Sequence, residues 1–297
     1  MLKKKIKQKK KPILKYVPYY GSKRRMVRKL RKMIPEHEKY VELFAGSGAL
    51  LLNHERSKVE IINDKAEEIS NLFEVMVDRE KGRQFINAVK SMNYDKDIFE
   101  AVKCAKKQYF HEFTQVEKAV LQYYLLTTSF NATGKQFAKG RFDSDEEYRK
   151  RVCKYLEDVY QRLEGVEVLN LDAIELLKIF VEDENAFLFM DPPYVKSLRG
   201  KGAGNVYAYE MELREHIEML KTIQNAKAKI MLCGYWMGEA DIYDSFLLPY
   251  GWKRIFVGNY PKSAQRKKDR DIGSEYIWLN YSIPIEIEKN FLKGEFA

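Results

Sequence analysis

One short apolar run that ends in two prolines restricts the architecture open to this chain. Residues Ala186–Met190 are all hydrophobic, and Asp191, Pro192 and Pro193 follow them directly. A continuous apolar run bounded by prolines is typical of a strand buried on both faces of a parallel sheet. Two prolines fix φ and remove two backbone donors, so the loop after the strand is stiff. Ligands of open α/β sheets bind at this edge, which makes Asp191, Pro192, Pro193 and Tyr194 candidate site residues.

A second strand, with a glycine-rich turn after it, precedes this run in the chain. Tyr40–Phe44 is predicted to be buried, and the turn Ala-Gly-Ser-Gly at 45–48 leads into a helix through Leu52. Glycines at such a turn let the backbone approach a ligand. The next strand, Val59–Ile62, ends near Asp64, whose carboxylate can accept hydrogen bonds from ribose hydroxyls. This pattern predicts half of a nucleotide-cofactor site, although Leu51 stands where a dinucleotide fingerprint has its third glycine.

Composition limits the classes of protein to which the chain can belong. Its 297 residues, 45% of them hydrophobic, can bury one large core with an insertion, or two modest domains. The net charge of +10 favours a polyanionic partner, although half of that excess could serve solubility alone. Three cysteines without CxxC spacing fit neither a disulfide framework nor a zinc site. We therefore expect a cytoplasmic protein with no metal, no membrane span and no signal peptide.

The order of patterns along the chain predicts its domains. Residues 1–15 are rich in lysine and are expected to form a basic flexible arm, either simply solvated or in contact with phosphates. From Lys65 to about Glu164 the apolar spacing is helical, and so long a block between strands predicts an inserted domain. The expected division is a discontinuous main domain of 16–70 and 165–285, a helical insertion of 71–164, and a tail of 286–297.

The later part of the chain continues the alternation of strands and helices. Strands are expected near 166–169, 229–233, 252–260 and 276–281, the last two as an antiparallel hairpin, and helices over 23–34, 211–225 and 239–248. The segment 196–210 is glycine-rich and basic, and it could be a linker or a lid over the site.

Two irregular basic segments are candidates for contact with nucleic acid. The first, Phe130–Phe142, combines glycines, cations and aromatic residues, which suits phosphate contacts and stacking. The alternative is a surface loop whose aromatic side chains pack on the helices beneath. The second, Lys262–Arg270, is the turn of the expected hairpin, and it could instead be a solvated, self-paired face. The predicted DNA-binding residues are Asn131, Lys135, Lys139, Arg141, Lys262, Arg266 and Lys267.

Three motifs carry a resemblance to a known family. They are Pro-Tyr-Tyr-Gly-Ser-Lys at 18–23, Phe-Ala-Gly-Ser-Gly at 44–48 and Asp-Pro-Pro-Tyr at 191–194, in that order. Together they resemble the adenine-N6 DNA methyltransferases of the D12 or Dam-like class. The resemblance covers most of the chain, from Val17 to Tyr281, and its specificity comes from the order of the three motifs. The family commonly has Ser-Phe-Asn-Gly in its recognition segment, so Ala132 departs from the pattern and leaves the turn there open.

The resemblance implies a fold, a cofactor and a set of site residues. The fold is the Rossmann-like α/β fold of S-adenosylmethionine-dependent methyltransferases, a mostly parallel seven-stranded sheet with an inserted helical domain. The cofactor S-adenosylmethionine is expected to contact Tyr19, Gly21, Lys23, Phe44, Gly46, Gly48, Asp64 and Asp172. The target base is expected to contact Asp191, Pro192, Pro193 and Tyr194. Asp172 could also serve simply as the N-cap of the following helix.

The expected function is site-specific methylation of N6 of a flipped adenine in double-stranded DNA. Asp191 and the carbonyl of Pro192 would accept the two hydrogens of the amino group, and Tyr194 would stack on the base. Three alternatives stay open: the same chemistry on cytosine N4 or on RNA, a small-molecule or protein methyltransferase, and a catalytically silent DNA-binding protein. The setting would be a bacterial or phage-infected cell, with restriction-modification among the roles, and a monomer is one expectation for the assembly. The recognised base sequence cannot be read from the chain.

Overall fold

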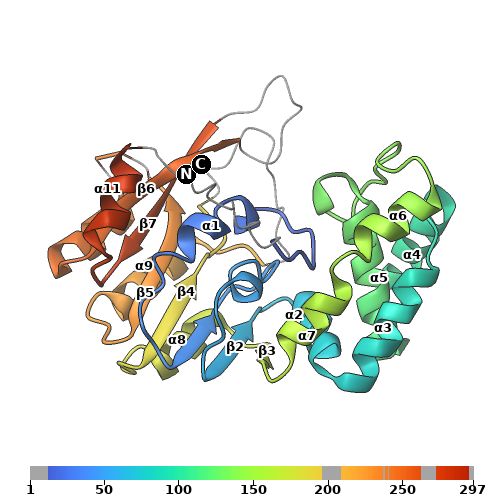
Figure 1. The fold of residues 1–297 in the computed structure, drawn as a ribbon, viewed down its shortest axis with the longest axis horizontal. Helices are drawn as coiled ribbons and strands as arrows, with labels where there is room; N and C mark the ends of the chain where they lie inside the picture. The colour runs from blue at the N-terminus through green and yellow to red at the C-terminus, as the bar shows by residue number, and fades with distance from the viewer. Residues whose placement is uncertain (1–12, 196–208, 237, 240, 262–271, 294–297) are drawn as a thin grey trace, which may run out of the picture.

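The computed structural model of the protein describes residues 13–195, 209–236, 238, 239, 241–261 and 272–293. Figure 1 shows a sheet flanked by helices on one side of the molecule and a group of helices on the other. The predicted DNA contacts Lys262, Arg266 and Lys267 lie outside the described residues. So do residues 1–12 of the predicted arm and 196–208 of the predicted lid.

Seven strands form one sheet in the order β3-β2-β1-β4-β5-β7-β6. Neighbouring strands from β3 to β5 are parallel, whereas β7 pairs antiparallel with both β5 and β6. The α/β class with a mostly parallel seven-stranded sheet is therefore confirmed. The strands are β1 (Lys39–Glu42), β2 (Val59–Asn63), β3 (Glu167–Leu169), β4 (Ala186–Met190), β5 (Lys229–Tyr235), β6 (Lys253–Pro261) and β7 (Ile272–Leu279).

The two central strands, β1 and β4, lie side by side although they are far apart in the sequence. Lys39 is in register with Ala186, and Glu42 with Phe189. Because the strands are parallel, the glycine turn after β1 and the proline loop after β4 leave the same edge next to each other. All five residues of β4 are buried, as expected of a strand covered on both faces.

Alternate side chains of β4 enter two different cores. Leu188 and Met190 face the core covered by helices α8 (Ala173–Phe180), α9 (Leu213–Ile223) and α10 (Ile242–Leu247). Phe187 and Phe189 face the other core, which extends through α1 (Val27–Leu30) and into the helical insertion. Burial of aliphatic and aromatic side chains on both faces is the main force that holds the sheet between its helices.

Six α-helices occupy the chain between β2 and β3, and four of them begin at a side-chain cap. They are α2 (Glu67–Val77), α3 (Arg79–Ser91), α4 (Lys96–Tyr109), α5 (Gln115–Thr128), α6 (Asp145–Val152) and α7 (Leu156–Leu163). Asp78, Asp95 and Ser144 cap α3, α4 and α6, and Thr114 forms a capping box with Glu117 at α5. The boundary expected at residue 70 falls inside α2, and the division into domains stays a prediction.

The helical insertion has two kinds of core. Residues of α2, α3, α5 and α7 share the large core that continues under the sheet. A separate cluster forms between α4, α5 and α6, where Phe99, Tyr124, Phe142 and Tyr148 are buried together. Phe137 of the irregular segment packs against it, with its ring 4.7 Å from that of Tyr94. Two of the three aromatic side chains in this segment therefore pack on the helices, while Phe130 is exposed.

Several helices are shorter than their sequence patterns predict. The helix expected over 23–34 is divided at Met26 into a 3₁₀ turn, Lys23–Arg25, and α1. The glycine turn is followed only by the 3₁₀ turn Leu51–Asn53. The helix expected to begin at Glu239 begins at Ile242, where Asp241 caps it. Beyond β7, α11 spans Ile285–Lys293.

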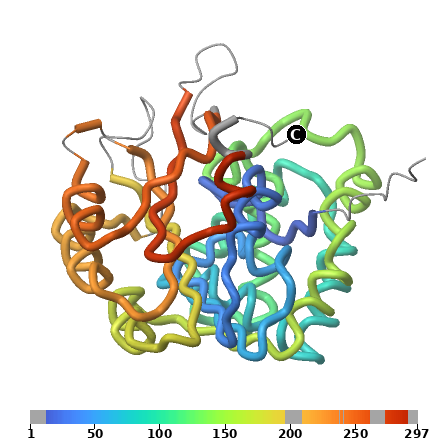
Figure 2. The backbone as a smooth tube through the Cα atoms, turned by 60° about the vertical axis from the view of Figure 1, so that its left-hand side comes forward, coloured from blue at the N-terminus to red at the C-terminus, as the bar shows by residue number. Residues whose placement is uncertain are grey.

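The early and late parts of the chain lie side by side (Figures 1 and 2). Lys29 Nζ donates to the carbonyl of Val257 at 2.7 Å, and the Tyr281 hydroxyl donates to the carbonyl of Met33 at 3.0 Å. These bonds hold the α1 segment against the β6–β7 hairpin. None of the described helices is long and apolar enough to span a membrane.

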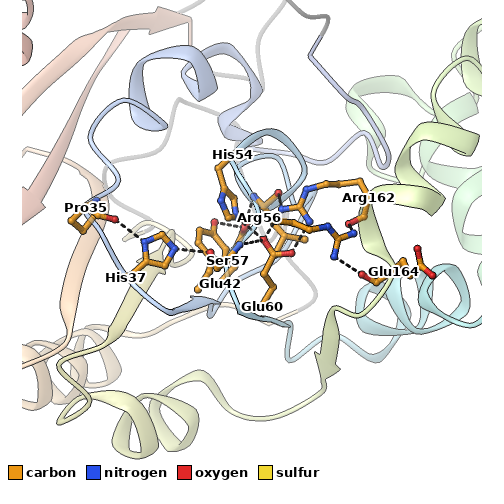
Figure 3. A network of polar contacts seen from close by, with 11 residues as sticks. Pro35, His37, Glu42, His54, Arg56, Ser57, Glu60, Arg162 and Glu164 are labelled. Carbon is orange, nitrogen blue, oxygen red and sulfur yellow. Dashed lines mark hydrogen bonds and ion pairs between the residues drawn. The ribbon is translucent and has the colours of Figure 1, made fainter.

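A network of polar contacts joins α7 to the sheet (Figure 3). Arg162 places its guanidinium nitrogens 2.7 Å from each carboxylate oxygen of Glu60 and 2.6 Å from the carbonyl of Leu51. His54 lies beside Glu60, but burial lowers the pKa of His54 to about 3 and keeps its ring neutral. Arg162 is therefore the cation that balances Glu60.

Candidate active site

A cavity with about 1020 Å³ of empty space, part of it open to solvent, lies at the carboxyl edge of the central strands. The loops after β1, β2 and β4, the start of α8 and the segment around the first 3₁₀ turn form its wall. Of the predicted cofactor residues, all but Gly48 line it, and so do Asp191 and Pro193 of the predicted catalytic loop. The further lining residues include Glu42, Ser47, Lys65, Tyr209, Glu210, Met211 and Glu215.

The two glycines after β1 are required by their surroundings. Gly46 and Gly48 have φ values of 46° and 58°, in the left-handed region that side chains disfavour. A Cβ at Gly46 would lie 2.8 Å from the ring of Tyr19, and one at Gly48 would lie 2.9 Å from the buried ring of Phe73. The turn therefore brings its backbone against Tyr19 on the cavity side, while Gly48 fits the turn onto the core.

Asp64, at the end of β2, presents a buried carboxylate to the cavity. Its Oδ2 accepts from the amide of Gly46 at 2.9 Å, and its Oδ1 accepts from the amide of Ala66 at 2.9 Å. Burial raises the pKa of Asp64 to about 6, although these two amides oppose the shift. Each oxygen has capacity for a further hydrogen bond, so the group is suited to accept from ligand hydroxyls.

Asp172 caps helix α8, as the sequence predicts. Its Oδ1 accepts from the amide of Ile174 at 2.9 Å, and its Oδ2 lies 2.7 Å from Lys65 Nζ. Burial would raise the pKa of Asp172, but the hydrogen bonds with Lys65 and Ile174 outweigh it and lower the pKa. The carboxylate is thus charged and fixed at the cavity wall. Its contact with the cofactor stays a prediction.

Lys23 and Asp191 form a buried ion pair where the first 3₁₀ turn meets the loop after β4. Lys23 Nζ lies 2.6 Å from Asp191 Oδ1, and the side chain of Lys23 is only 6% exposed. Burial alone would lower the pKa of Lys23, but the carboxylates of Asp191 and Glu275 outweigh it and raise the pKa. Burial raises the pKa of Asp191, and Lys23 opposes that shift. The pair therefore fixes Oδ1 of the carboxylate, and a hydrogen bond from the Tyr194 side chain also opposes the rise in the pKa of Asp191.

Tyr194 lies behind this pair instead of in the cavity wall. Its ring is 8% exposed, with Lys23 Nζ 4.8 Å from the ring centre and the ring of Tyr235 4.6 Å away in an edge-on arrangement. Its hydroxyl donates to Glu275 Oε2 at 2.8 Å. Stacking of a base on Tyr194 stays a prediction.

Comparison with known proteins identifies the family. A family model described as D12 class N6 adenine-specific DNA methyltransferase matches residues 19–253. The chain belongs to this family. The matched range contains all of the expected cofactor residues and the Asp-Pro-Pro-Tyr loop, whereas β7 and Glu275 lie beyond it.

Other comparisons of this D12 family chain add little. A crystal structure of wild-type Trm5b from Pyrococcus abyssi is 12% identical, and the match covers 90% of this chain. The chain spans 57% of the length of that structure, and the TM-score of 0.34 is too low to bear on function. No curated protein matches the chain.

Two buried acids near Asp191, Glu42 and Glu275, were not predicted from the sequence. Glu42, at the end of β1, accepts through Oε2 from the Tyr40 hydroxyl at 2.8 Å and from the Leu51 amide at 3.0 Å. Burial raises the pKa of Glu42 to about 8, so it is largely protonated at neutral pH. Glu275 is the second. Both are acids at inward positions of otherwise apolar strands, and that period-2 pattern is the signal that could have found them.

Of the predicted DNA-binding residues in the irregular segment, Arg141 lines a second cavity. This cavity, with about 1130 Å³ of empty space, shares Ser22, Ser47 and Ala49 with the first. Among the described residues that line it, five are cationic and none is acidic: Lys15, Arg24, Arg141, Arg151 and Lys154. Burial and the like charges of Arg151 and Arg24 lower the pKa of Arg141, which indicates that the three guanidinium groups lie close together.

The remaining predicted contacts of the segment are not brought to this cavity. Lys135 and Lys139 are exposed, and Asn131 is half-buried with φ of 52°. Ala132, where the family commonly has glycine, also takes a left-handed φ of 55°. The turn therefore has a glycine-like conformation despite the alanine. Among the described residues, no cluster of three or more His, Cys, Asp or Glu could hold a metal ion.

Proposed function

We propose that the protein transfers a methyl group from S-adenosylmethionine to N6 of an adenine in double-stranded DNA. The observation that carries the proposal is the Lys23–Asp191 pair. It stands at the edge of a cavity formed by the glycine turn, within a chain of the D12 family. Catalysis on a base within a duplex requires that the base leave the stack, so the proposal includes base flipping.

The cavity suits this cofactor. Asp64 would accept from the ribose hydroxyls, Asp172 would face the adenine amino group, and the backbone of Gly46 would lie against the nucleoside. The space at Gly46, which a Cβ would close, fits a ligand that approaches the main chain. When bound, S-adenosylmethionine supplies a methyl group on a sulfonium, which is already a good leaving group.

The protein's task is then to align and activate the adenine nitrogen. The N6 lone pair is delocalised into the ring, and acceptors that take the two amino hydrogens make it available. Asp191 Oδ2 and the carbonyl of Pro192 would be these acceptors, held in place by the proline pair and by Lys23. Because positive charge develops on nitrogen during attack, Asp191 stabilises that charge and later receives the proton that the methylated amine loses.

The basic cavity supports a nucleic acid as the substrate. Its cations lie beside the transfer site, separated from it by a wall in which Ser22 Oγ and Ser47 Oγ are 2.7 Å apart. Three arginines without an acid among the described lining residues suit a phosphodiester backbone, because phosphate binds guanidinium with charge-assisted hydrogen bonds.

The test is digestion and mass spectrometry of DNA and RNA from a host that lacks adenine methylation of its own. The host expresses the wild type, Asp191→Asn, or Asp183→Asn. Asp183 precedes β4 and pairs with Lys39 at the opposite edge of the sheet, so it is a matched control. We expect N6-methyladenine in DNA with the wild type and Asp183→Asn, and at least a hundredfold less with Asp191→Asn. Sequencing the methylated positions would then give the recognition site.

Other outcomes would redirect the proposal. Methylation of RNA alone, or 4-methylcytosine in place of N6-methyladenine, would keep the cavity and Asp191 but replace the substrate. No modified base in any sample, together with DNA binding by the purified protein, would identify a silent DNA-binding protein. Equal methylation by wild type and Asp191→Asn would remove Asp191 from the proposed chemistry.

A further inference from the structure

Glu275 occupies an apolar position on the last strand of the sheet. Buried and exposed residues alternate at the start of β7, and the residues on the same face as Glu275 are Gly273, Ile277 and Leu279. Glu275 itself is only 7% exposed. A carboxylate in such a place costs folding free energy unless neighbouring groups compensate it. Its partners therefore indicate what the residue is for.

Two tyrosine side chains form hydrogen bonds with Glu275, Tyr235 and the tyrosine of the catalytic loop, Tyr194. The Tyr194 hydroxyl donates to Glu275 Oε2 at 2.8 Å within the buried interior. This bond joins β7 to the residue three positions after Asp191. A tyrosine ring that is enclosed and bonded at its hydroxyl has a fixed direction, and the stiff Pro192-Pro193 link transmits that direction to Asp191.

A second residue of β7, Gly273, affects the position of the Tyr194 ring through Tyr235. Gly273 leaves room for Tyr235, since a Cβ there would lie 2.8 Å from the Tyr235 ring. The ring of Tyr235 in turn packs edge-on against Tyr194 at 4.6 Å. Two residues on one face of β7 therefore set the position of Tyr194, one through its hydroxyl and one through its ring.

We propose that Glu275 is a positioning residue of the methyl-transfer site, which holds the Tyr194 hydroxyl and thereby fixes the loop that carries Asp191. The inference rests on the proposed function. It adds a part of the chain that lies beyond the range matched by the family model. In this arrangement the reach of the side chain matters more than its charge, because the hydrogen bond to Tyr194, and not the electrostatic attraction to Lys23, directs the loop.

Three substitutions separate reach from charge. Glu275→Gln keeps the length and the acceptor oxygen but removes the charge. Glu275→Asp keeps the charge but shortens the side chain by one methylene, and Glu275→Ala removes both. With saturating cofactor, we expect kcat of Glu275→Gln within about threefold of wild type and kcat of the other two lower by about tenfold or more. KM for DNA should stay within about twofold throughout. Glu286→Gln, an exposed change of the same kind in α11, is the control.

The same substitutions also decide against the proposal. If Glu275→Asp is the active variant and Glu275→Gln the impaired one, the residue acts through its charge and the positioning role is wrong. Tyr194→Phe/Glu275→Asp should be no slower than the slower single variant, because each change breaks the hydrogen bond between Tyr194 and Glu275. If the fold-loss of kcat in the double variant equals the product of the two single fold-losses, the proposal is wrong.

Urea unfolding without DNA or cofactor provides a readout that does not depend on activity. Non-additive unfolding free energies for Tyr194→Phe and Glu275→Asp would show that the two side chains interact, and additive values would show that they do not. A wild-type protein that methylates no base would refute the proposed function and the positioning role with it. Active wild type with unaffected variants would refute the positioning role alone.

Discussion

Three acids that line the cavity have pKa values raised by desolvation: Glu42, which is fully enclosed, and Asp64 and Asp191, which are half-buried. Glu42 is the clearest case, because its Oε2 accepts two hydrogen bonds and its pKa is about 8. A protonated acid there presents a hydrogen-bond donor to the ligand cavity at neutral pH. The site therefore combines charged and neutral acids within a few strands, which lets one face accept hydrogen bonds while another donates them.

The raised pKa of Glu42 predicts how stability changes with pH. The folded state keeps the proton up to about pH 8, whereas the unfolded chain loses it near 4.5, so stability is lost as pH rises between these values. Glu42→Gln keeps an acceptor oxygen and an uncharged partner group, and it should abolish this loss. Relative to the variant, wild type should lose up to about 1.4 kcal/mol of unfolding free energy per pH unit. Urea unfolding from pH 5 to 8 measures it, and parallel curves would contradict the prediction.

At the scale of single residues, the site residues that belong to sequence motifs could be predicted. Residues whose role depends on a partner distant in the sequence could not. Asp64, Asp172 and Asp191 were predictable because each follows an apolar strand, and the structure brings all three to one cavity. Lys23 was predicted at the cofactor, but its pairing with Asp191 joins residues too far apart for spacing to reveal. Glu275 could have been found as an inward acid of β7, but nothing local marks Tyr194 as its partner.

At the scale of secondary-structure elements, the buried ion pair between Arg162 and Glu60 joins α7 to β2. Replacing Arg162 by Met would leave Glu60 charged and buried without its cation, so we expect a loss of about 3–5 kcal/mol in unfolding free energy. The control is Arg83→Met, which removes an exposed pair between Arg83 and Glu157 and should cost no more than about 1 kcal/mol. Chemical denaturation of both variants at pH 7 measures the contrast. Equal losses would show that solvent reaches Glu60.

The glycine turn offers an equally direct test of the close packing around it. Gly48→Ala adds a Cβ 2.9 Å from the ring of Phe73 and also forces a left-handed alanine, for an expected cost of about 2–4 kcal/mol. Gly140 has a similar φ of 72° but nothing within 4 Å of the added Cβ. Gly140→Ala should therefore cost about 1 kcal/mol, the backbone strain alone. Thermal unfolding of the two variants separates strain from overpacking, and equal shifts would contradict the packing argument.

The strands were easier to predict than the helices of the candidate site. Each of the seven strands has an apolar core, and all seven were expected, with bounds that differ by a few residues at the ends. The interruption at Met26 was not visible in the apolar spacing of 23–34, which suits one continuous helix. The tertiary contact of this segment, the hydrogen bond from Lys29 to the carbonyl of Val257 in β6, was equally invisible in that spacing.

In the described part of the molecule, cationic side chains gather at the second cavity. The second cavity brings together Arg24 from the first 3₁₀ turn with Arg141 and Arg151 from the insertion. The sequence predicted Arg141 as a DNA contact but could not place Arg24 or Arg151 beside it, because only the docking of the helical insertion on the main sheet does so. The +10 net charge alone would have allowed any arrangement.

This charge arrangement predicts the salt dependence of DNA binding. If Arg151 contacts a phosphate, Arg151→Gln should reduce the slope of log K against log salt concentration by about 1 and weaken binding to all sequences alike. Arg83→Gln removes the same charge from α3, outside the cavity, and should leave the slope unchanged. Fluorescence anisotropy with a labelled duplex at several salt concentrations provides the measurement. An unchanged slope for Arg151→Gln would place the DNA elsewhere.

The sheet order also has a consequence for the synthesis of the protein. β6 is made before β7, yet in the sheet it is joined to β5 only through β7, which pairs with both. While the ribosome has not passed β7, the nascent chain has an open edge at β5 and a strand without a partner, the kind of surface that chaperones cover. The carboxylate that reaches Tyr194 arrives with the same strand. A growing or shortened chain would thus hold the family motifs before it could orient them, and full activity would coincide with closure of the sheet.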